Sequence, residues 1–186
     1  MRWYELNKTL TAVEREPNAD TAAVVLMTSD ELSHSAPIAG LERTLHHTPQ
    51  ARDAKVCKAE VRSDCMAGTL VVPQSWKNGE ALRCGYLVTA RRVVLVDDTG
   101  VIESHLKHIM REKHAVNGGV GMFLYYFFEN LIAKDLHHLE EIEDRAQSLE
   151  DDVLSGRLDN FNTPMTRLRK ETMAYFRYYS QLDDVA

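Results

Sequence analysis

The chain has 186 residues, of which 44% are hydrophobic and 27% are charged, so it can bury a core of ordinary size in one or two domains. Its formal net charge of −6 argues against nucleic acid as the main partner, because phosphate binding needs a basic face. The 3 cysteines include no Cys-x-x-Cys pair, which indicates neither a disulfide framework nor a zinc ribbon. We expect them to be reduced thiols in or near strands.

Neither a targeting segment nor a membrane span is visible in these residues. Residues 1–6 lack the long apolar stretch of a signal peptide. The longest apolar run, residues 120–128, is too short to cross a bilayer, which takes about 20 residues. This part of the protein is therefore expected to be soluble and intracellular.

Alternating and β-branched apolar runs predict several strands in the first half of the chain. The predicted strands are residues 2–6, 21–27, 55–61, 65–73, 82–90 and 92–96. Turns are expected at residues 62–64, 76–80 and 97–100, and Asn78-Gly79 is the strongest turn signal. Helices are expected at residues 29–32, capped by Ser29, at 37–47 and at 101–114. The pattern predicts an α/β or α+β layered domain without fixing the strand order.

The region from Glu129 to Ser155 is strongly acidic, with nine Asp and Glu residues against only Lys134 and Arg145. Apolar or small residues recur there at steps of three and four, at Ile132, Leu136, Leu139, Ile142, Ala146, Leu149 and Val153. This pattern predicts one helix that begins near Val120 and runs for roughly 35 residues, about 50 Å. Such a rod normally belongs to an assembly.

A second, more basic helix is expected after a short turn. Gly156 is a natural helix end, residues 157–162 form the turn, and Thr163-Pro164 is a typical helix start. Its apolar stripe is Met165, Leu168, Thr172, Phe176, Tyr179 and Leu182. We expect an antiparallel pair whose opposite charges attract. The alternative is an ordinary hairpin with two solvated faces, since surface ion pairs are weak. With no stop signal before Ala186, the helix is expected to continue beyond this sequence.

Histidines offer one candidate metal site. His105 and His108 lie three residues apart on a predicted helix, and imidazoles at this spacing can share a zinc or similar ion. The alternative is that both are solvated helix residues.

Five segments follow one another in the second half of the chain: Tyr86-Leu87-Val88-Thr89-Ala90-Arg91, Tyr125-Tyr126-Phe127-Phe128-Glu129-Asn130-Leu131-Ile132, Leu139-Glu140-Glu141-Ile142-Glu143-Asp144, Leu149-Glu150-Asp151-Asp152-Val153-Leu154 and Leu168-Arg169-Lys170-Glu171. Taken in this order, they resemble the cytoplasmic region of the CorA family of magnesium and divalent-cation channels. The resemblance implies an α+β fold, with an αβα-layered domain and mixed sheet at residues 1–114. Residues 115–186 would hold the long acidic helix, a turn and the start of a stalk helix.

The resemblance also implies an oligomeric state and a cellular location. In that family the region forms a homopentamer at the cytoplasmic face of the cell membrane, and the stalk leads into membrane helices. The pore segment with its Gly-Met-Asn signature is absent from these residues. This chain alone is therefore not expected to transport an ion.

Mg²⁺ or another divalent cation is the implied ligand. Magnesium sheds its water reluctantly, so weak outer-sphere sites between acidic subunits suit a sensor of cytosolic metal, and their occupancy would favour a closed state. The resemblance assigns Glu42 and Glu129 to such sites. Arg43 and Lys134 depart from the family's pattern, because they stand where acids are common in the family.

Two classes of function follow. The first is a regulatory and oligomerisation domain of a CorA-like channel or transporter. The second is a soluble oligomeric interaction domain without membrane function. An enzyme is not expected, because Gly-x-Ser-x-Gly and His-Glu-x-x-His motifs are absent from the sequence.

Overall fold

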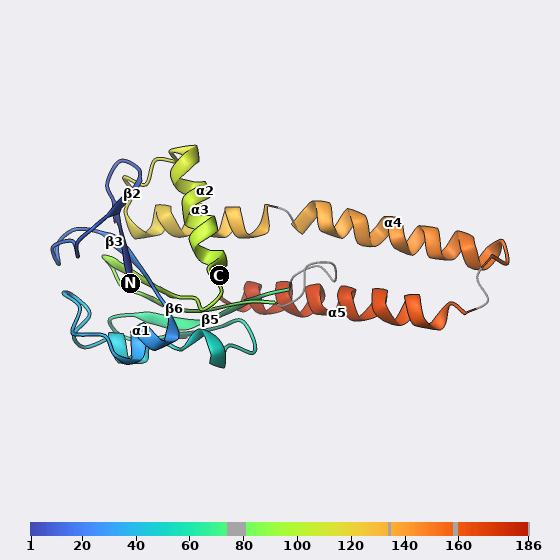
Figure 1. Cartoon of the computed structure of the whole chain (residues 1–186), viewed down its shortest axis with the longest axis horizontal. Helices are drawn as coiled ribbons and strands as arrows, with labels where there is room; N and C mark the ends of the chain where they lie inside the picture. Colours follow the sequence, from blue (N-terminus) through green and yellow to red (C-terminus); the bar gives the residue numbers. More distant parts are fainter. Residues whose placement is uncertain (74–80, 134, 158–159, 186) are drawn as a thin grey trace.

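The computed structural model describes residues 1–73, 81–133, 135–157 and 160–185. It consists of a sheet-containing body and a long helical hairpin that projects from one end of it (Figure 1). The predicted turn at residues 76–80 lies outside the described residues, as does Lys134.

The body is built on a seven-stranded sheet with the order β2-β1-β3-β7-β6-β5-β4. The strands are β1 (Arg2–Leu6), β2 (Leu10–Val13), β3 (Ala23–Met27), β4 (Lys58–Val61), β5 (Met66–Val72), β6 (Leu82–Val88) and β7 (Arg92–Val96). The sheet is mixed, because β3 and β7 are parallel whereas the other pairs are antiparallel. Every predicted strand is present. The sequence did not reveal β2, since only Leu10 of its four residues is buried and it forms no apolar run.

Both faces of the sheet are covered, as the period-2 alternation of β3 requires. Val24 and Leu26 pack with helices α2 (Val101–Glu112) and α3 (Val120–Ile132). Val25 and Met27 face the opposite side, which is covered by α1 (Ser29–Ser33) and two short 3-10 helices, Leu45–His47 and Ala51–Asp53. The α+β fold with an αβα layering is therefore confirmed. The helix predicted at residues 37–47 is wrong except for its last turn.

Two adjacent carboxylates at the end of β7 hold a helix on each face. Asp97 accepts a hydrogen bond from the backbone N–H of Ile102, at 2.9 Å, and so fixes the start of α2. Asp98 accepts from the backbone N–H and the hydroxyl of Ser29, both at 2.7 Å. Ser29 is therefore not the cap of α1, as the sequence suggested. Thr28 caps that helix, in a reciprocal pair of hydrogen bonds with Glu31.

A buried arginine joins the loops at one end of the sheet. Arg92 is 1% exposed. Its guanidinium donates to the backbone carbonyls of Pro17 at 2.9 Å, Asn18 at 2.7 Å and Ala39 at 3.3 Å, and also to that of Thr21. Because peptide carbonyls carry no full charge, the cation is solvated here by dipoles in place of water.

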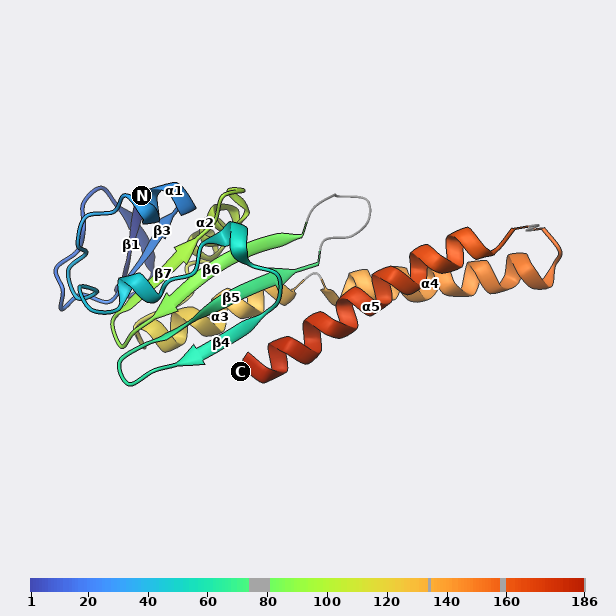
Figure 2. The same cartoon turned by 90° about the horizontal axis from the view of Figure 1, so that it is seen from below.

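The predicted single rod is two helices. Helix α3 packs on the sheet, with Phe123 and Phe127 fully buried, and ends at Ile132. Helix α4 (Asp135–Leu154) then continues in roughly the same direction away from the body (Figures 1 and 2). The apolar spacing runs on unchanged from Ile132 to Leu136, so it carries no sign of the break.

Helix α5 (Asn162–Val185) returns antiparallel to α4 and completes the hairpin. Gly156 follows α4 with φ of 66°, so its prediction as the helix end is confirmed. The far end of α5 comes back to the body beside β4 (Figure 2), where the Cys57 backbone N–H donates to the Gln181 side-chain oxygen at 3.0 Å. Within the described residues α5 is the returning arm of a hairpin, and its assignment as the start of a stalk stays a prediction.

The cysteines have the expected state. Cys57, Cys65 and Cys84 are all free and buried. Burial raises the pKa of the Cys84 thiol, on β6, far above its usual value, so that thiol stays protonated and unreactive.

Candidate functional site

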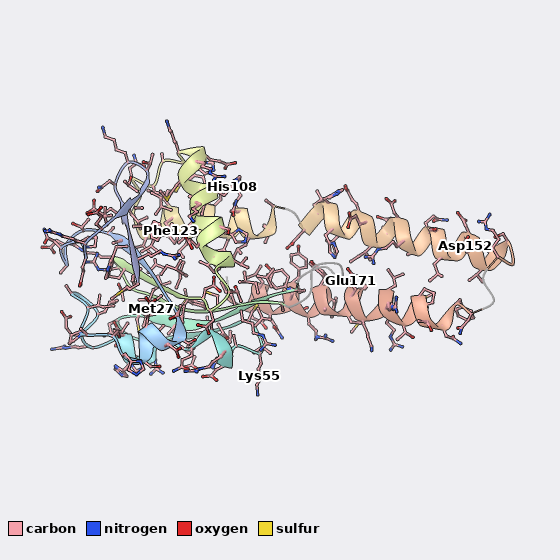
Figure 3. The ribbon with its side chains drawn as sticks, in the orientation of Figure 1. Met27, Lys55, His108, Phe123, Asp152 and Glu171 are labelled. Carbon is pink, nitrogen blue, oxygen red and sulfur yellow. The ribbon has the colours of Figure 1, made fainter. Side chains whose placement is uncertain are left out.

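The seam between α4 and α5 contains a cluster of ionisable side chains. Glu171 on α5 lies in this seam (Figure 3), with only 8% of its side chain exposed. One carboxylate oxygen lies 2.9 Å from Nε2 of His138, within ion-pair distance but without hydrogen-bond angles. The other accepts a hydrogen bond from Arg145, also at 2.9 Å. Glu171 therefore joins two residues of α4 that lie two turns apart.

Tyrosine rings close the body end of the seam. Tyr175 packs on the His138 ring, with 4.8 Å between the centroids, and its hydroxyl donates to the carbonyl of Pro73 at 3.1 Å. Burial, followed by the nearby charges of Asp135 and Glu171, raises the pKa of Tyr175 to about 12. The ring stays neutral at physiological pH and ties α5 to the end of β5.

Asp135, the first residue of α4, is buried and accepts a hydrogen bond from the hydroxyl of Tyr179 at 2.8 Å. Burial raises the pKa of this carboxyl, and the Tyr179 hydrogen bond offsets only part of the effect. The folded protein thus binds this proton more tightly than the unfolded chain does.

The raised pKa gives a testable pH dependence. The stability that comes from protonating Asp135 is present below the usual aspartate pKa and is lost as the pH rises through the folded-state value. Asp135→Asn keeps an acceptor for Tyr179 but does not titrate. Relative to this variant, the wild type should lose stability as the pH rises through that window. Unfolding free energies of both proteins from acid to neutral pH test this, and a difference that does not change with pH would contradict it.

The expected attraction between an acidic and a basic helix is wrong in its detail. The contacts between the charged groups of α4 and α5 converge on Glu171, an acid on the basic helix, and they use His138 and Arg145 from the acidic one. Glu143 of α4 and Arg169 of α5 are exposed and have no ion pair within the described residues. The alternative of two solvated outer faces describes these charges better.

The seam cluster is only weakly indicated by the sequence. His138, Ile142, Arg145 and Leu149 follow one another at helical spacing, which is the signal of an inward stripe. Because polar residues occupy two of these four positions, a search for apolar residues at helical spacing selects the neighbouring stripe, which contains Leu139.

The structure places the predicted metal ligands apart. His105 turns toward α3, with Nδ1 at 2.5 Å from Oδ1 of Asn130, whereas His108 is exposed and pairs with Glu112 at 3.1 Å. Glu129 is exposed on α3. The described part of the chain has no group of three or more His, Cys, Asp or Glu residues that could hold a metal ion.

Glu42 lies on the other side of the sheet, in a turn and not in the helix that the sequence pattern predicts at residues 37–47. The backbone N–H groups of Glu42 itself and of Gly40 hold the pKa of its carboxyl below the usual value, so it is ionised. Within the described residues, a single chain brings neither Glu42 and Glu129 nor the two imidazoles of His105 and His108 into a common metal site. The role of Glu42 and Glu129, which the resemblance places between subunits, stays a prediction, and so does the separate candidate site of His105 and His108.

No helix among the described residues combines the length and the apolar composition that a membrane span requires.

No protein-family model matches the chain, and no curated protein matches it in sequence. Solved structures do match in fold. Full-length CmaX superposes with a TM-score of 0.69 at 13% identity, over 99% of this chain and 60% of that one. The cytoplasmic domain of ZntB from Vibrio parahaemolyticus gives a TM-score of 0.65 at 12% identity, over 97% of this chain and 75% of that one.

CorA from Methanocaldococcus jannaschii matches in two structures. Its soluble domain gives a TM-score of 0.70 at 14% identity, over 98% of this chain and 76% of that one. The complete structure, described as a magnesium transporter, gives 0.69 at 16% identity, over 94% of this chain and 57% of that one. The chain thus spans about 60% of the full-length proteins that it matches.

Sheet, covering helices and projecting hairpin all fall within these superpositions, which leave almost no residue of this chain unmatched. The chain therefore has the fold of the CorA-like N-terminal soluble domain.

Proposed function

We propose that the chain is the cytoplasmic regulatory and oligomerisation domain of a CorA-like channel or transporter for a divalent metal ion. The observation that carries this proposal is the match to the soluble domain of CorA over 98% of the chain, including the hairpin. A related complete structure is described as a magnesium transporter. Mg²⁺ is therefore the first candidate ion, with Co²⁺ and Zn²⁺ as alternatives.

The proposed mode of action is metal sensing between copies. Glu42 and Glu129 are both exposed, and so are available to a neighbouring copy, where carboxylates could bind hydrated Mg²⁺ through its water. An occupied site would stabilise a closed homo-oligomer, for which the resemblance implies five copies, and an empty one would let the carboxylates repel. His105 and His108 are the weaker candidates, since their imidazoles already face Asn130 and Glu112.

A titration with Mg²⁺ tests the sensing role. On the order of 1 mM Mg²⁺ should raise protease resistance and promote assembly more than NaCl of equal ionic strength does. Glu42→Gln and Glu129→Gln should each reduce this response, whereas Glu140→Gln, an exposed acid on α4, should not. If Mg²⁺ acted no differently from NaCl, or if all three variants responded alike, the assignment of these residues would be wrong.

A further inference from the structure

Two titratable side chains are buried close together at the start of α4. Asp135 is 6% exposed, and His138, three residues later, is 9% exposed. Both contact α5, since Asp135 accepts the hydrogen bond of Tyr179 and His138 lies against Glu171. Buried groups that gain or lose charge with pH are uncommon, and they are the groups through which proteins couple protonation to a change of conformation.

The charged groups that face this pair come from both helices. Glu171 of α5 lies 2.9 Å from Nε2 of His138, and Glu141 of α4 lies 3.6 Å from Nδ1 of the same ring. Arg145 of α4 binds the other oxygen of Glu171 at 2.9 Å. Because Glu141 is 41% exposed, solvent screens its charge more than that of Glu171, which is 8% exposed. The balance of charge in the seam therefore depends on Asp135, His138, Arg145 and Glu171.

Tyrosine rings enclose the pair without adding charge. Tyr175 packs on the His138 ring, and Tyr178 contacts the rings of both Tyr175 and Tyr179. Burial is the largest cause that raises the pKa of all three hydroxyls, that of Tyr175 to about 12. Cys57 of the body lies near Tyr178, and burial raises the pKa of its thiol as well. These four groups stay neutral at physiological pH.

The contact between His138 and Glu171 is favourable mainly as an interaction between charges. Nε2 and the carboxylate oxygen are 2.9 Å apart, but their angles do not suit a hydrogen bond. A neutral imidazole gains little from such a contact, because a hydrogen bond needs direction as well as distance. An imidazolium attracts the carboxylate from any direction, and a buried seam strengthens this attraction. The contact therefore stabilises the seam when His138 is protonated.

The balance of charge in the seam reverses when the pair loses its protons. With both residues protonated, the cations of His138 and Arg145 face the single carboxylate of Glu171. With both deprotonated, Arg145 alone faces the carboxylates of Asp135 and Glu171. A buried charge without a partner is costly, and exposure to water removes that cost. Rising pH thus disfavours the closed seam at both residues of the pair.

The fold allows the seam to open without disturbing the sheet. Helix α3 ends at Ile132 and is anchored on the sheet by Phe123 and Phe127, which are fully buried. Helix α4 begins separately at Asp135 and leads away from the body (Figures 1 and 2). A movement of α4 therefore need not displace α3 or the strands. Projecting segments of this kind open locally at a lower free energy than the core.

We propose that the hairpin is a pH-responsive element, in which protonated Asp135 and His138 hold α4 against α5 and loss of their protons releases it. The closed form also keeps Tyr175 bonded to the Pro73 carbonyl at the end of β5, so the state of the seam is felt at the body. The switch lies within one chain. It depends neither on the proposed function nor on metal, and it is compatible with any number of copies in an assembly.

Hydrogen exchange in EDTA tests the switch. Protection factors at each pH are taken relative to the chemical exchange rate at that pH, which removes the intrinsic pH dependence of exchange. Between about pH 5 and about pH 8, the range in which imidazoles usually change charge, the protection of α4 and α5 should fall by on the order of tenfold. The protection of β3 and β7 should not change, because the core opens independently of the hairpin.

Substitutions assign the response to the pair. His138→Gln and Asp135→Asn should each reduce the fall in protection, and the double variant should abolish it, because neither position then titrates. His137→Gln is the matched control, since His137 is the neighbouring residue of α4 but its side chain is 78% exposed. This control should respond like the wild type. The measured quantity is the change with pH, so a variant that is less protected at every pH still tests the proposal.

Four results would each overturn the proposal. They are hairpin protection in the wild type that does not change with pH, an equal fall in β3 and β7, a full response in the double variant, and a response lost in His137→Gln.

Discussion

Arg92→Met is expected to lower the free energy of unfolding by about 4 kcal/mol. The substitution keeps much of the side-chain volume but removes the donors for four backbone carbonyls, and Arg92 is 1% exposed, so little water can replace them. Each buried acceptor left without a partner costs about 1–3 kcal/mol, and partial relaxation of the loops reduces the total. Equilibrium unfolding in urea measures the difference.

Arg91 supplies the matched control for this prediction. Its side chain is 56% exposed and pairs with Asp20, which is 97% exposed. Arg91→Met should therefore cost less than about 1 kcal/mol. Similar losses for the two variants would show that the carbonyl contacts of Arg92 do not hold the loops.

The second large effect is expected at Glu171. Glu171→Gln keeps the size of the side chain but removes the charge that faces both His138 and Arg145. Breaking a buried ion pair costs about 3–5 kcal/mol, and since the Arg145 side chain is 33% exposed, solvent screening lowers our expectation to about 2 kcal/mol.

Because the Glu171 cluster lies in the seam between α4 and α5, the loss of stability should appear first in the hairpin. Hydrogen exchange should accelerate in α4 and α5 while the sheet stays protected. Asp144→Asn, at an exposed position of α4, should measurably change neither the free energy of unfolding nor the hydrogen-exchange rates of α4 and α5. Uniform acceleration over the whole chain would mean that hairpin and body unfold as one unit, contrary to this expectation.

The body was largely predictable because its central strands, β3 and β7, are buried on both faces. Residues 23–27 and 92–96 are buried throughout, so their β-branched runs are unmistakable in sequence. Strand order depends on long-range pairing, such as β3 with β7, for which the sequence offers no local signal. Strand β2 was missed for the opposite reason, since it lies at an edge and buries little.

The hairpin was predictable as a pair of helices but not in its contacts. A wide apolar stripe on α4 contains both Ile142 and Leu149, which face α5, and Leu139 and Val153, which do not. Spacing alone cannot divide such a stripe between two partners. His138 and Arg145 are favourable at inward positions only because Glu171 faces them there. Glu171 lies 26 residues beyond Arg145 in the chain, so local spacing does not reveal this contact.

The candidate metal site was the least predictable part. Glu42 and Glu129 lie on opposite sides of the sheet, and His105 and His108 point to different neighbours. A site shared between copies depends on how the copies are arranged. Neither the sequence nor the fold of one chain determines that arrangement.

The central claim is that this fold serves a divalent-ion transporter, and the complete coding sequence with fractionation of the expressed product tests it most directly. The account predicts two apolar spans of about 20 residues after residue 186, the first ending in Gly-Met-Asn, and a product that sediments with membranes. A stop codon directly after Ala186, with the product in the soluble fraction, would contradict it and favour a soluble interaction domain.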